Sequence, residues 1–129
     1  MSEPFIFIGT HTIRDGKLQD FRKSCGELLE VVEAHEPRLI AFNFYANQDE
    51  TEMSVVQVHP DADSMLFHMQ VAREHITHAT EELLVTRNMQ IYGRPNDAVL
   101  AMIKELSQAG VPLIVKPNHL GGFTRSSAG

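Results

Sequence analysis

The chain has 129 residues, 43% of them hydrophobic and 22% charged, which is the composition of one ordinary globular domain. Its 11 Lys and Arg against 17 Asp and Glu give a formal net charge of −6, and this sign argues against nucleic acid as a partner, because phosphate backbones are bound by positive charge. The single cysteine, Cys25, excludes disulfides within the chain and every cysteine-based zinc pattern.

Membrane association is not expected either. No apolar run approaches the roughly 20 residues that a helix needs to span a bilayer. The opening residues Met-Ser-Glu-Pro lack the basic and apolar regions of a signal peptide. We therefore expect a cytoplasmic protein.

The first predicted elements are a strand over residues 5–12 and a helix over residues 17–34. The strand segment is short and rich in β-branched and aromatic residues, and Arg14-Asp15-Gly16 ends it. The apolar residues of the helix recur on one stripe of 3.6-residue period: Leu18, Phe21, Cys25, Leu28, Leu29 and Val32. Glu36 and Pro37 end this helix, because the residue before a proline is driven out of the α region.

Two more strands and a second helix follow. Residues 38–46 and 53–59 are extended runs joined by a polar turn at residues 47–50, so they are predicted to pair as an antiparallel hairpin. Asp61 or Asp63 then caps a helix over residues 64–84, which we expect to break near His75.

The last part of the chain is predicted to hold a strand over residues 87–93, a helix and short edge strands. Asn96 can cap the helix, and Gly110 is placed as the residue just beyond its end. The helix stripe is Val99, Met102, Ile103 and Leu106. Residues 111–125 are interpreted as one or two short edge strands.

The resulting order is β-α-β-β-α-β followed by an α-β extension. The first six elements match the ferredoxin-like arrangement, an antiparallel sheet with helices on one face, so the predicted fold class is α+β. We expect residues 1–129 to form a single domain, with a core of about residues 5–93 and a C-terminal extension over residues 95–125.

Alternation along the strands divides their side chains between the two faces of the sheet. One set is almost wholly apolar and is predicted to face the helices: Ile6, Ile8, Ile40, Phe42, Phe44, Val56, Val58, Met89 and Ile91. The other set mixes apolar and hydrogen-bonding residues: Phe5, Phe7, His11, Leu39, Ala41, Asn43, Tyr45, Met53, Val55, Gln57, His59, Asn88, Gln90 and Tyr92.

The mixed face predicts a ligand pocket. Its apolar residues do not suit bulk water, and its amides would lack partners in a dry core, so we interpret it as an enclosed, partly polar cavity for a small molecule. One chain has too few helices to cover it, and the second subunit of a homodimer is the expected lid. The alternative is an amphipathic sheet whose polar positions are solvated.

Several segments share their order and spacing with a known family. They are the opening strand before Gly16-Lys17-Leu18, the Glu33-x-x-Glu36-Pro37 that ends the first helix, the Phe42-x-Phe44-Tyr45 strand, the strand of residues 52–58, and the Pro60-Asp61-Ala62-Asp63 that precedes a helix holding His68. In these segments, over about residues 5–93, the chain resembles the antibiotic biosynthesis monooxygenase domains of the dimeric α+β barrel superfamily.

The resemblance implies a homodimer in which two ferredoxin-like sheets pack face to face and each subunit keeps a cavity between its sheet and its helices. The pocket then lies either on the helix side of the sheet or between the two sheets, and the assignment to the mixed face depends on the alternation alone. Members include cofactor-independent oxygenases of quinols and polyketide anthrones, haem-degrading enzymes, and proteins without known activity. This chain has no tryptophan and carries Gly9-Thr10-His11 where the haem degraders carry an asparagine, so haem chemistry is poorly supported, although His78 could serve as an axial ligand. We expect no cofactor.

An oxygenase without metal or flavin needs a base, because the anion of a phenol-like substrate passes an electron to dioxygen more easily than the neutral molecule does. Histidine suits this role near neutral pH. His68 and His75 lie at one margin of their helix stripe, and His11 and His59 share the mixed sheet face at comparable strand ends, where they could converge. His11, His59 and His68 are therefore candidate bases; the alternative is that such histidines are ordinary exposed or capped side chains.

The remaining candidate residues would bind substrate. They are Asn43, Tyr45, Gln57, Gln90, Tyr92 and His75. Two histidines and an amide could also hold zinc or iron, but no H-x-H, H-E-x-x-H or 2-His-1-carboxylate spacing is present, so no metal is expected. Cys25 lies in an apolar stripe and is interpreted as an inert thiol.

Two functions stay open at this point. The first is a cofactor-independent monooxygenase, or related oxidoreductase, of a small aromatic or quinol-like substrate. The second is a non-catalytic dimeric protein of the same fold that binds a small ligand.

Overall fold

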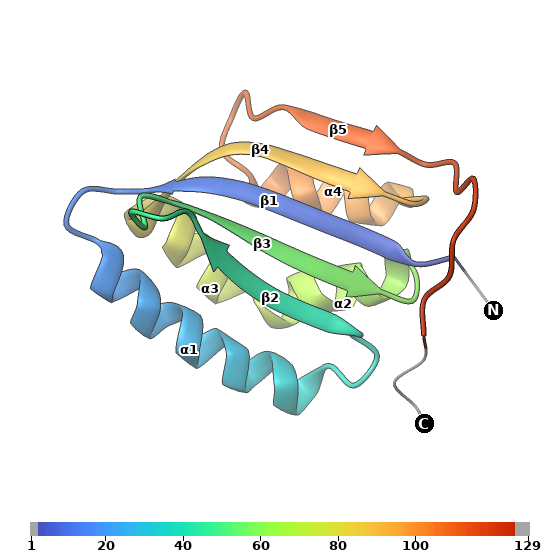
Figure 1. Ribbon diagram of the computed structural model, residues 1–129, viewed down its shortest axis with the longest axis horizontal. Helices are drawn as coiled ribbons and strands as arrows, with labels where there is room; N and C mark the ends of the chain where they lie inside the picture. Colours follow the sequence, from blue (N-terminus) through green and yellow to red (C-terminus); the bar gives the residue numbers. More distant parts are fainter. Residues whose placement is uncertain (1–2, 126–129) are drawn as a thin grey trace.

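A computed structural model describes residues 3–125 and has one five-stranded sheet with the helices packed on one face (Figure 1). The strands are β1 (Phe5–Ile13), β2 (Ala41–Ala46), β3 (Glu52–His59), β4 (Leu84–Tyr92) and β5 (Leu113–Lys116). The helices are α1 (Leu18–His35), α2 (Ala62–Val71), α3 (Arg73–His78), the π-helix η1 (Ala79–Leu83) and α4 (Asp97–Leu106). The predicted α+β, ferredoxin-like architecture is confirmed.

The strand order across the sheet is β2-β3-β1-β4-β5. β1 pairs antiparallel with β3 and β4, and β2 pairs antiparallel with β3, which confirms the predicted hairpin. β5 runs parallel to β4 at the edge of the sheet. Up to residue 125 the C-terminal extension therefore contributes one helix and one edge strand, and residues 121–123 form no second strand.

The predicted second helix, residues 64–84, is in fact three consecutive helices. The break lies at Ala72 and not near His75, and the last segment winds as a π-helix that leads directly into β4. β4 consequently begins at Leu84 rather than at residue 87. Asp61 is confirmed as the N-cap of α2, since its carboxylate accepts a hydrogen bond from the N–H of Ser64.

Two further boundaries differ from prediction. β2 begins at Ala41 rather than at residue 38, because residues 36–39 form a turn after the first helix. Asn96 caps α4 as predicted, accepting a hydrogen bond from the N–H of Val99. That helix ends at Leu106, however, because the next residue is already extended, so Gly110 lies in the following loop rather than at the helix end.

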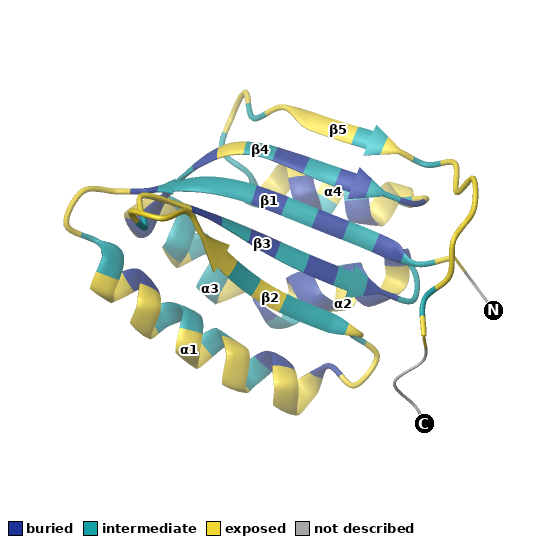
Figure 2. Cartoon of the chain, viewed as in Figure 1, coloured by how far each residue is buried: buried dark blue, intermediate teal, exposed yellow. Residues whose placement is uncertain are grey.

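The predicted assignment of the sheet faces is wrong for β1 and β3. In the observed register Phe7 lies opposite both Gln57 and Ile91, and Gln57 lies opposite Phe42. Residues directly opposite each other point to the same side of a sheet, so these four side chains share one face. Burial along the strands identifies it as the face under the helices (Figure 2).

The corrected faces mix the two predicted sets. The face under the helices carries Phe5, Phe7, His11, Phe42, Phe44, Met53, Val55, Gln57, His59, Thr86, Met89 and Ile91. The open face carries Ile6, Ile8, Ala41, Asn43, Tyr45, Val56, Val58, Asn88, Gln90 and Tyr92. Alternation could not decide which side chains of β1 face the helices, because both alternating sets are apolar. In the structure the bulkier phenylalanines fill the core, and the isoleucines remain half-buried on the open face.

Two clusters of buried side chains lie between the sheet and the helices. The larger includes Phe5, Phe7, Val55, Met65, Met69, Ile91, Val99 and Ile103. The smaller consists of Ile13, Phe21, Met53, Leu83 and Leu84. Phe44 packs against both, and its ring meets that of Phe21 edge to face. None of the helices between residues 3 and 125 is both long and apolar enough to cross a membrane.

A β-bulge lies where β1 meets β4. Thr10 pairs with Asn88 and His11 pairs with Thr86, so Arg87 is an extra residue on β4. The bulge turns Thr86 to the helix side of the sheet, directly beside His11.

Candidate functional site

A partly open cavity of about 130 Å³ lies between the sheet and the helices, among residues of both core clusters. Most of its lining is apolar and comes from phenylalanine, methionine and aliphatic side chains. The polar residues at its wall are His11, Ser24, Gln57, His68, His75, Thr80, Thr86 and Ser107. An apolar bed with a few polar groups is what a small-molecule site requires.

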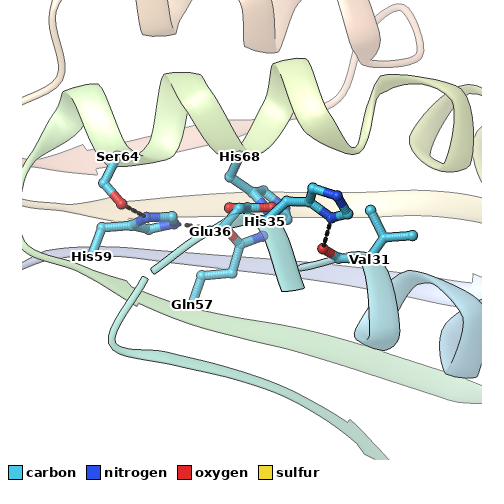
Figure 3. Close-up of polar contacts among 7 residues, drawn as sticks. All are labelled: Val31, His35, Glu36, Gln57, His59, Ser64 and His68. Carbon is cyan, nitrogen blue, oxygen red and sulfur yellow. Dashed lines mark hydrogen bonds and ion pairs between the residues drawn. The ribbon is translucent and has the colours of Figure 1, made fainter. Parts of the chain in front are cut away.

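His68 and Glu36 form a buried pair beside this cavity (Figure 3). Nδ1 of His68 lies 3.0 Å from both carboxylate oxygens of Glu36, and the side chains are only 3% and 2% exposed. A carboxylate can only accept here, so Nδ1 carries the proton and donates it. In a neutral imidazole this leaves the lone pair on Nε2, to which no residue of the described chain forms a hydrogen bond.

Local structure positions both members of this pair. Glu36 is the C-cap residue of α1, and Pro37 prevents the helix from continuing beyond it. His68 lies in the last turn of α2, where its ring packs on that of Phe42 with 5.0 Å between the centroids. The end of α1 and the end of α2 thus hold the carboxylate and the imidazole together.

His59 lies next to this pair in a second hydrogen-bonded unit (Figure 3). Its Nε2 is 2.9 Å from Oε1 of Gln57, and its Nδ1 is 2.7 Å from the hydroxyl of Ser64. The amide oxygen can only accept, so Nε2 donates to Gln57 and Nδ1 accepts from Ser64. Burial, with a smaller contribution from the neighbouring His68, lowers the pKa of His59 to about 3, so its imidazole is neutral near pH 7.

His11 lies at the other end of the sheet from His59. β1 and β3 are antiparallel, so His59 is opposite Phe5 while His11 is opposite Met53. Six residues of strand, roughly 20 Å, separate the two histidines, and the expected convergence does not occur. Nδ1 of His11 is 3.0 Å from the hydroxyl of Thr86, and burial lowers the pKa of His11 to about 4.

The structure divides the predicted site residues between two faces of the sheet. The cavity wall includes His11, Gln57, His68 and His75. His59 hydrogen bonds to Gln57 but is not part of the wall. Asn43, Tyr45, Gln90 and Tyr92 lie on the open face, where the hydroxyl of Tyr92 donates to Gln90 over 2.6 Å.

Sequence analysis missed the role of Glu36. It treated this residue only as part of a helix-ending motif, whereas only 5% of it is exposed and its carboxylate binds His68. A signal was present, because Glu36 follows Val32 by four residues and so continues the apolar stripe of α1. A carboxylate on an apolar stripe needs a buried partner.

The site shows no grouping of metal ligands. Within residues 3–125, no three His, Cys, Asp or Glu side chains gather in a way that could hold a metal ion.

Comparison with known proteins gives matches by structure only. No family model matches the chain, and no curated protein matches its sequence. MupZ from Pseudomonas fluorescens has 18% sequence identity and a TM-score of 0.70, with 97% of this chain and 91% of MupZ covered. SnoaB, a cofactor-independent oxygenase from Streptomyces nogalater, has 14% identity and a TM-score of 0.61, with 74% of this chain and 96% of SnoaB covered.

A candidate antibiotic biosynthesis monooxygenase from Bacteriodes thetaiotaomicron has 14% identity and a TM-score of 0.55, with 69% of this chain and 85% of that one covered. The match to MupZ extends over the C-terminal helix and edge strand, since it leaves out only about 3% of the chain. Identities this low establish the fold alone. The chain thus has the fold of the antibiotic biosynthesis monooxygenase-like proteins, extended at its C-terminal end by α4 and β5.

Proposed function

We propose that the protein is a cofactor-independent monooxygenase, or a closely related oxidoreductase, that acts on small aromatic or quinol-like molecules. The observation that carries this proposal is the buried Glu36–His68 pair at the wall of an apolar cavity. Its fold is also that of SnoaB, a cofactor-independent oxygenase, which supports the same class of reaction.

His68 is the proposed base. His59 has both ring nitrogens in hydrogen bonds and lies outside the cavity wall. His11 lines the cavity, but a pKa of about 4 makes it a weak base at neutral pH. His68 offers the lone pair of Nε2, and Glu36 stabilises the positive charge that the imidazole gains when it accepts a proton.

The cavity suits a molecule with one aromatic ring. Its volume of about 130 Å³ is close to that of an apolar protein cavity of about 150 Å³ known to hold one benzene molecule. The rings of Phe7 and Phe42 supply part of the bed. Gln57 also lines the cavity, and its amide N–H, which bonds to no residue between 3 and 125, can donate to an oxygen that becomes negatively charged.

The proposed reaction balances with dioxygen as the sole oxidant. His68 takes a proton from the substrate, and the anion transfers one electron to dioxygen. The two radicals join at the ring carbon para to the oxygen, His68 returns its proton to the peroxide, and loss of water then converts this ring C–H into C=O, so that a phenol and dioxygen give a quinone and water. A simple quinol would instead give a quinone and hydrogen peroxide.

Glu36 also links the site to the surface of the protein. It lines a surface groove together with His35, residues 37–39, Ser64 and Phe67, whereas His68 lines the cavity. The pair therefore joins the cavity to the surface. We propose that this path lets the pair exchange protons with solvent between turnovers, whereas the proton taken from the substrate returns to the peroxide and leaves in water or hydrogen peroxide.

We also propose that two copies pair through the open face of the sheet. Ile6 and Ile8 of β1 and Val56 and Val58 of β3 are half-buried there, no helix within residues 3–125 lies over them, and Tyr45 is 62% exposed. An apolar sheet face left uncovered favours a partner of the same kind. The second copy would cover this face, while the cavity is formed within one chain.

Oxygen uptake with a panel of phenols, hydroquinones and catechols tests the proposal. The wild type should consume oxygen, and His68→Gln should lower kcat by roughly 10²- to 10⁴-fold, the usual contribution of a positioned base. The exposed His119→Gln, at a position that lines neither the cavity nor the grooves, is the matched control that should retain the rate, and His11→Gln should retain far more of it than His68→Gln. A collapse in His11→Gln alone would contradict the assignment of the base. Compounds that raise the melting temperature without any oxygen uptake would favour the non-catalytic binding protein.

A further inference from the structure

We propose that the cavity opens between α1 and α3 into a surface groove, and that this groove holds the polar end of the ligand and excludes an anionic one. The proposal rests on the proposed function for the aromatic end of the ligand. Beyond that function, the proposal says where the cavity opens to the surface and which class of substituent the aromatic ring of the ligand carries.

Two residues connect the cavity and the groove. Ser24 of α1 and His75 of α3 line both spaces. The groove is completed by Lys17, Asp20, Lys23, Glu27, Glu74, His78, Glu82 and Leu83. Side chains shared by two spaces place them next to each other, so a ligand leaving the cavity at this point passes between Ser24 and His75.

The packing of α3 favours an opening at this position. α3 has no buried residue, in contrast to α2 before it, and its Ile76 is only half-buried where it packs against the larger cluster. α1 contacts α2 and η1 but has little contact with α3, which lies between them in the chain. A segment without buried side chains can move at a lower free-energy cost than elements anchored in the core, so α3 can admit a ligand without disrupting the fold.

The charges around the groove decide which substituents it accepts. Two lysines face four carboxylates, and Lys17 already pairs with Asp20 at 3.8 Å. Glu27, Glu74 and Glu82 form no ion pair within residues 3–125. The groove therefore repels a carboxylate or a phosphate and accepts a hydroxyl, an amide or an amine. The inferred ligand class is a single aromatic ring carrying an uncharged or cationic polar substituent.

Cys25 allows the opening to be tested without any substrate. It lines the cavity and is the single cysteine of the chain, so labelling reports access to the cavity. Three aliphatic disulfides of similar size serve as probes: cystamine, which is cationic, 2-hydroxyethyl disulfide, which is neutral, and 3,3′-dithiodipropionate, which is anionic. In each case the Cys25 thiolate attacks a sulfur of the probe, forms a mixed disulfide and releases the other half as a thiol.

For Cys25, the rate of reaction with cystamine is divided by the rate of reaction with dithiodipropionate. This ratio is then divided by the same ratio measured for the uncharged thiol N-acetylcysteinamide, which gives the normalised ratio. The same thiol is used in both reactions, so its thiolate fraction cancels. We expect a normalised ratio of about 10 at low salt, because charged grooves change association rates by at least this factor. At 1 M salt, where the Debye length is about 3 Å, it should approach one.

Matched variants locate the effect. Glu27→Lys and Glu74→Lys should each reduce the normalised ratio several-fold, whereas Glu33→Lys, an exposed change on α1 outside the groove, should leave it unaltered. His75→Trp should slow all three probes by narrowing the opening. A wild-type ratio of one at low salt, or an equal response to Glu33→Lys and Glu27→Lys, would overturn the proposal.

A matched set of catechols tests the ligand class directly. Dopamine, hydroxytyrosol and 3,4-dihydroxyphenylacetate differ mainly in the end of a short side chain, and the first two should raise the melting temperature more than the third. An equal shift with the carboxylate would contradict the inferred class. Charge selection without oxygen uptake would contradict the proposed oxygenase activity and support the proposed groove. Oxygen uptake without charge selection would contradict the groove and support the oxygenase activity.

Discussion

Nδ1 of His68 lies 3.0 Å from each carboxylate oxygen of Glu36, although 32 positions separate the two residues in the sequence. The contact joins the end of α1 to α2 in a region that is almost free of solvent. Each side chain therefore depends on the other, because a buried polar or charged group without a partner is costly. The same contact fixes the tautomer of the imidazole, so it links the stability of the fold to the chemistry of the site.

Truncation of either member of the pair should destabilise the protein. We expect Glu36→Ala and His68→Ala each to reduce the free energy of unfolding by about 3 kcal/mol, because each leaves the other side chain buried and unpaired. The double variant should lose clearly less than the sum of the two. Urea denaturation measures these values, with the exposed Glu33→Ala as a control within about 0.5 kcal/mol of wild type. Additive losses would show that the two side chains do not stabilise each other.

The neutral buried histidines should make the protein less stable in mild acid. The pKa of His11 is lowered from 6.5 to about 4 and that of His59 from 6.5 to about 3. Below pH 6.5 the unfolded chain binds protons that the folded chain does not, so stability falls with pH until the folded pKa is reached. Each histidine contributes a slope of up to roughly 1.4 kcal/mol per pH unit between about pH 6.5 and its lowered pKa.

Urea denaturation at pH 7, 6 and 5 measures this slope. His59→Asn should flatten it, whereas His35→Asn, at an exposed position, should leave it unchanged. An NMR titration in which the ring C–H of His59 shifts with a midpoint near 6.5 would contradict the lowered pKa.

Filling the cavity should weaken ligand binding without unfolding the chain. Ala79 lines the cavity, and Ala79→Leu adds a side chain that occupies part of the space for one ring. The rise in melting temperature produced by saturating phenol should therefore shrink or disappear in this variant, because ligand stabilisation follows the affinity for the folded state. Ala34→Leu, on the exposed side of α1, is the matched control. An undiminished response in Ala79→Leu would show that phenol binds elsewhere.

Charges placed on the open face should separate the proposed dimer. Ile8→Lys and Val56→Lys introduce cations into the apolar centre of this face, so sedimentation velocity should show monomers at concentrations where the wild type is dimeric. Leu29→Lys, at a 39% exposed position of α1, should not change the association state. A wild type that sediments as a monomer at tens of micromolar would contradict the pairing.

Element order was predictable from the sequence because it depends on local periodicity. The stripe of α1, the polar turn between β2 and β3, and the caps Asp61 and Asn96 all lie within a few residues of the features they specify. The order β2-β3-β1-β4 followed because these elements match a common arrangement.

The faces of the sheet were not predictable in the same way. Phe5 and Phe7 alternate with Ile6 and Ile8, and either phase is apolar enough for a core, so the choice depends on the pairing of Phe7 with Gln57 across two strands. That error moved the expected pocket to the wrong side of the sheet. It also put Asn43, Tyr45, Gln90 and Tyr92 in one group with His11 and Gln57, although the sheet separates them.

The contact of Glu36 with His68 depends on how α1 and α2 pack against each other. The periodicity of either helix alone does not predict that packing. The bulge at Arg87 was not predictable for the same reason. It depends on how β1 and β4 pair, and that pairing places Thr86 beside His11. Contacts between distant segments therefore account for most of what sequence analysis missed at the site.

A crystal structure of the protein soaked with hydroquinone tests the central claim most directly. We predict that the ring lies in the cavity between the sheet and the helices, with a hydroxyl within about 3 Å of Nε2 of His68 and Nδ1 still bonded to Glu36. A ring bound on the open face of the sheet, or seated in the cavity with its hydroxyl on His11 and not on His68, would contradict this account.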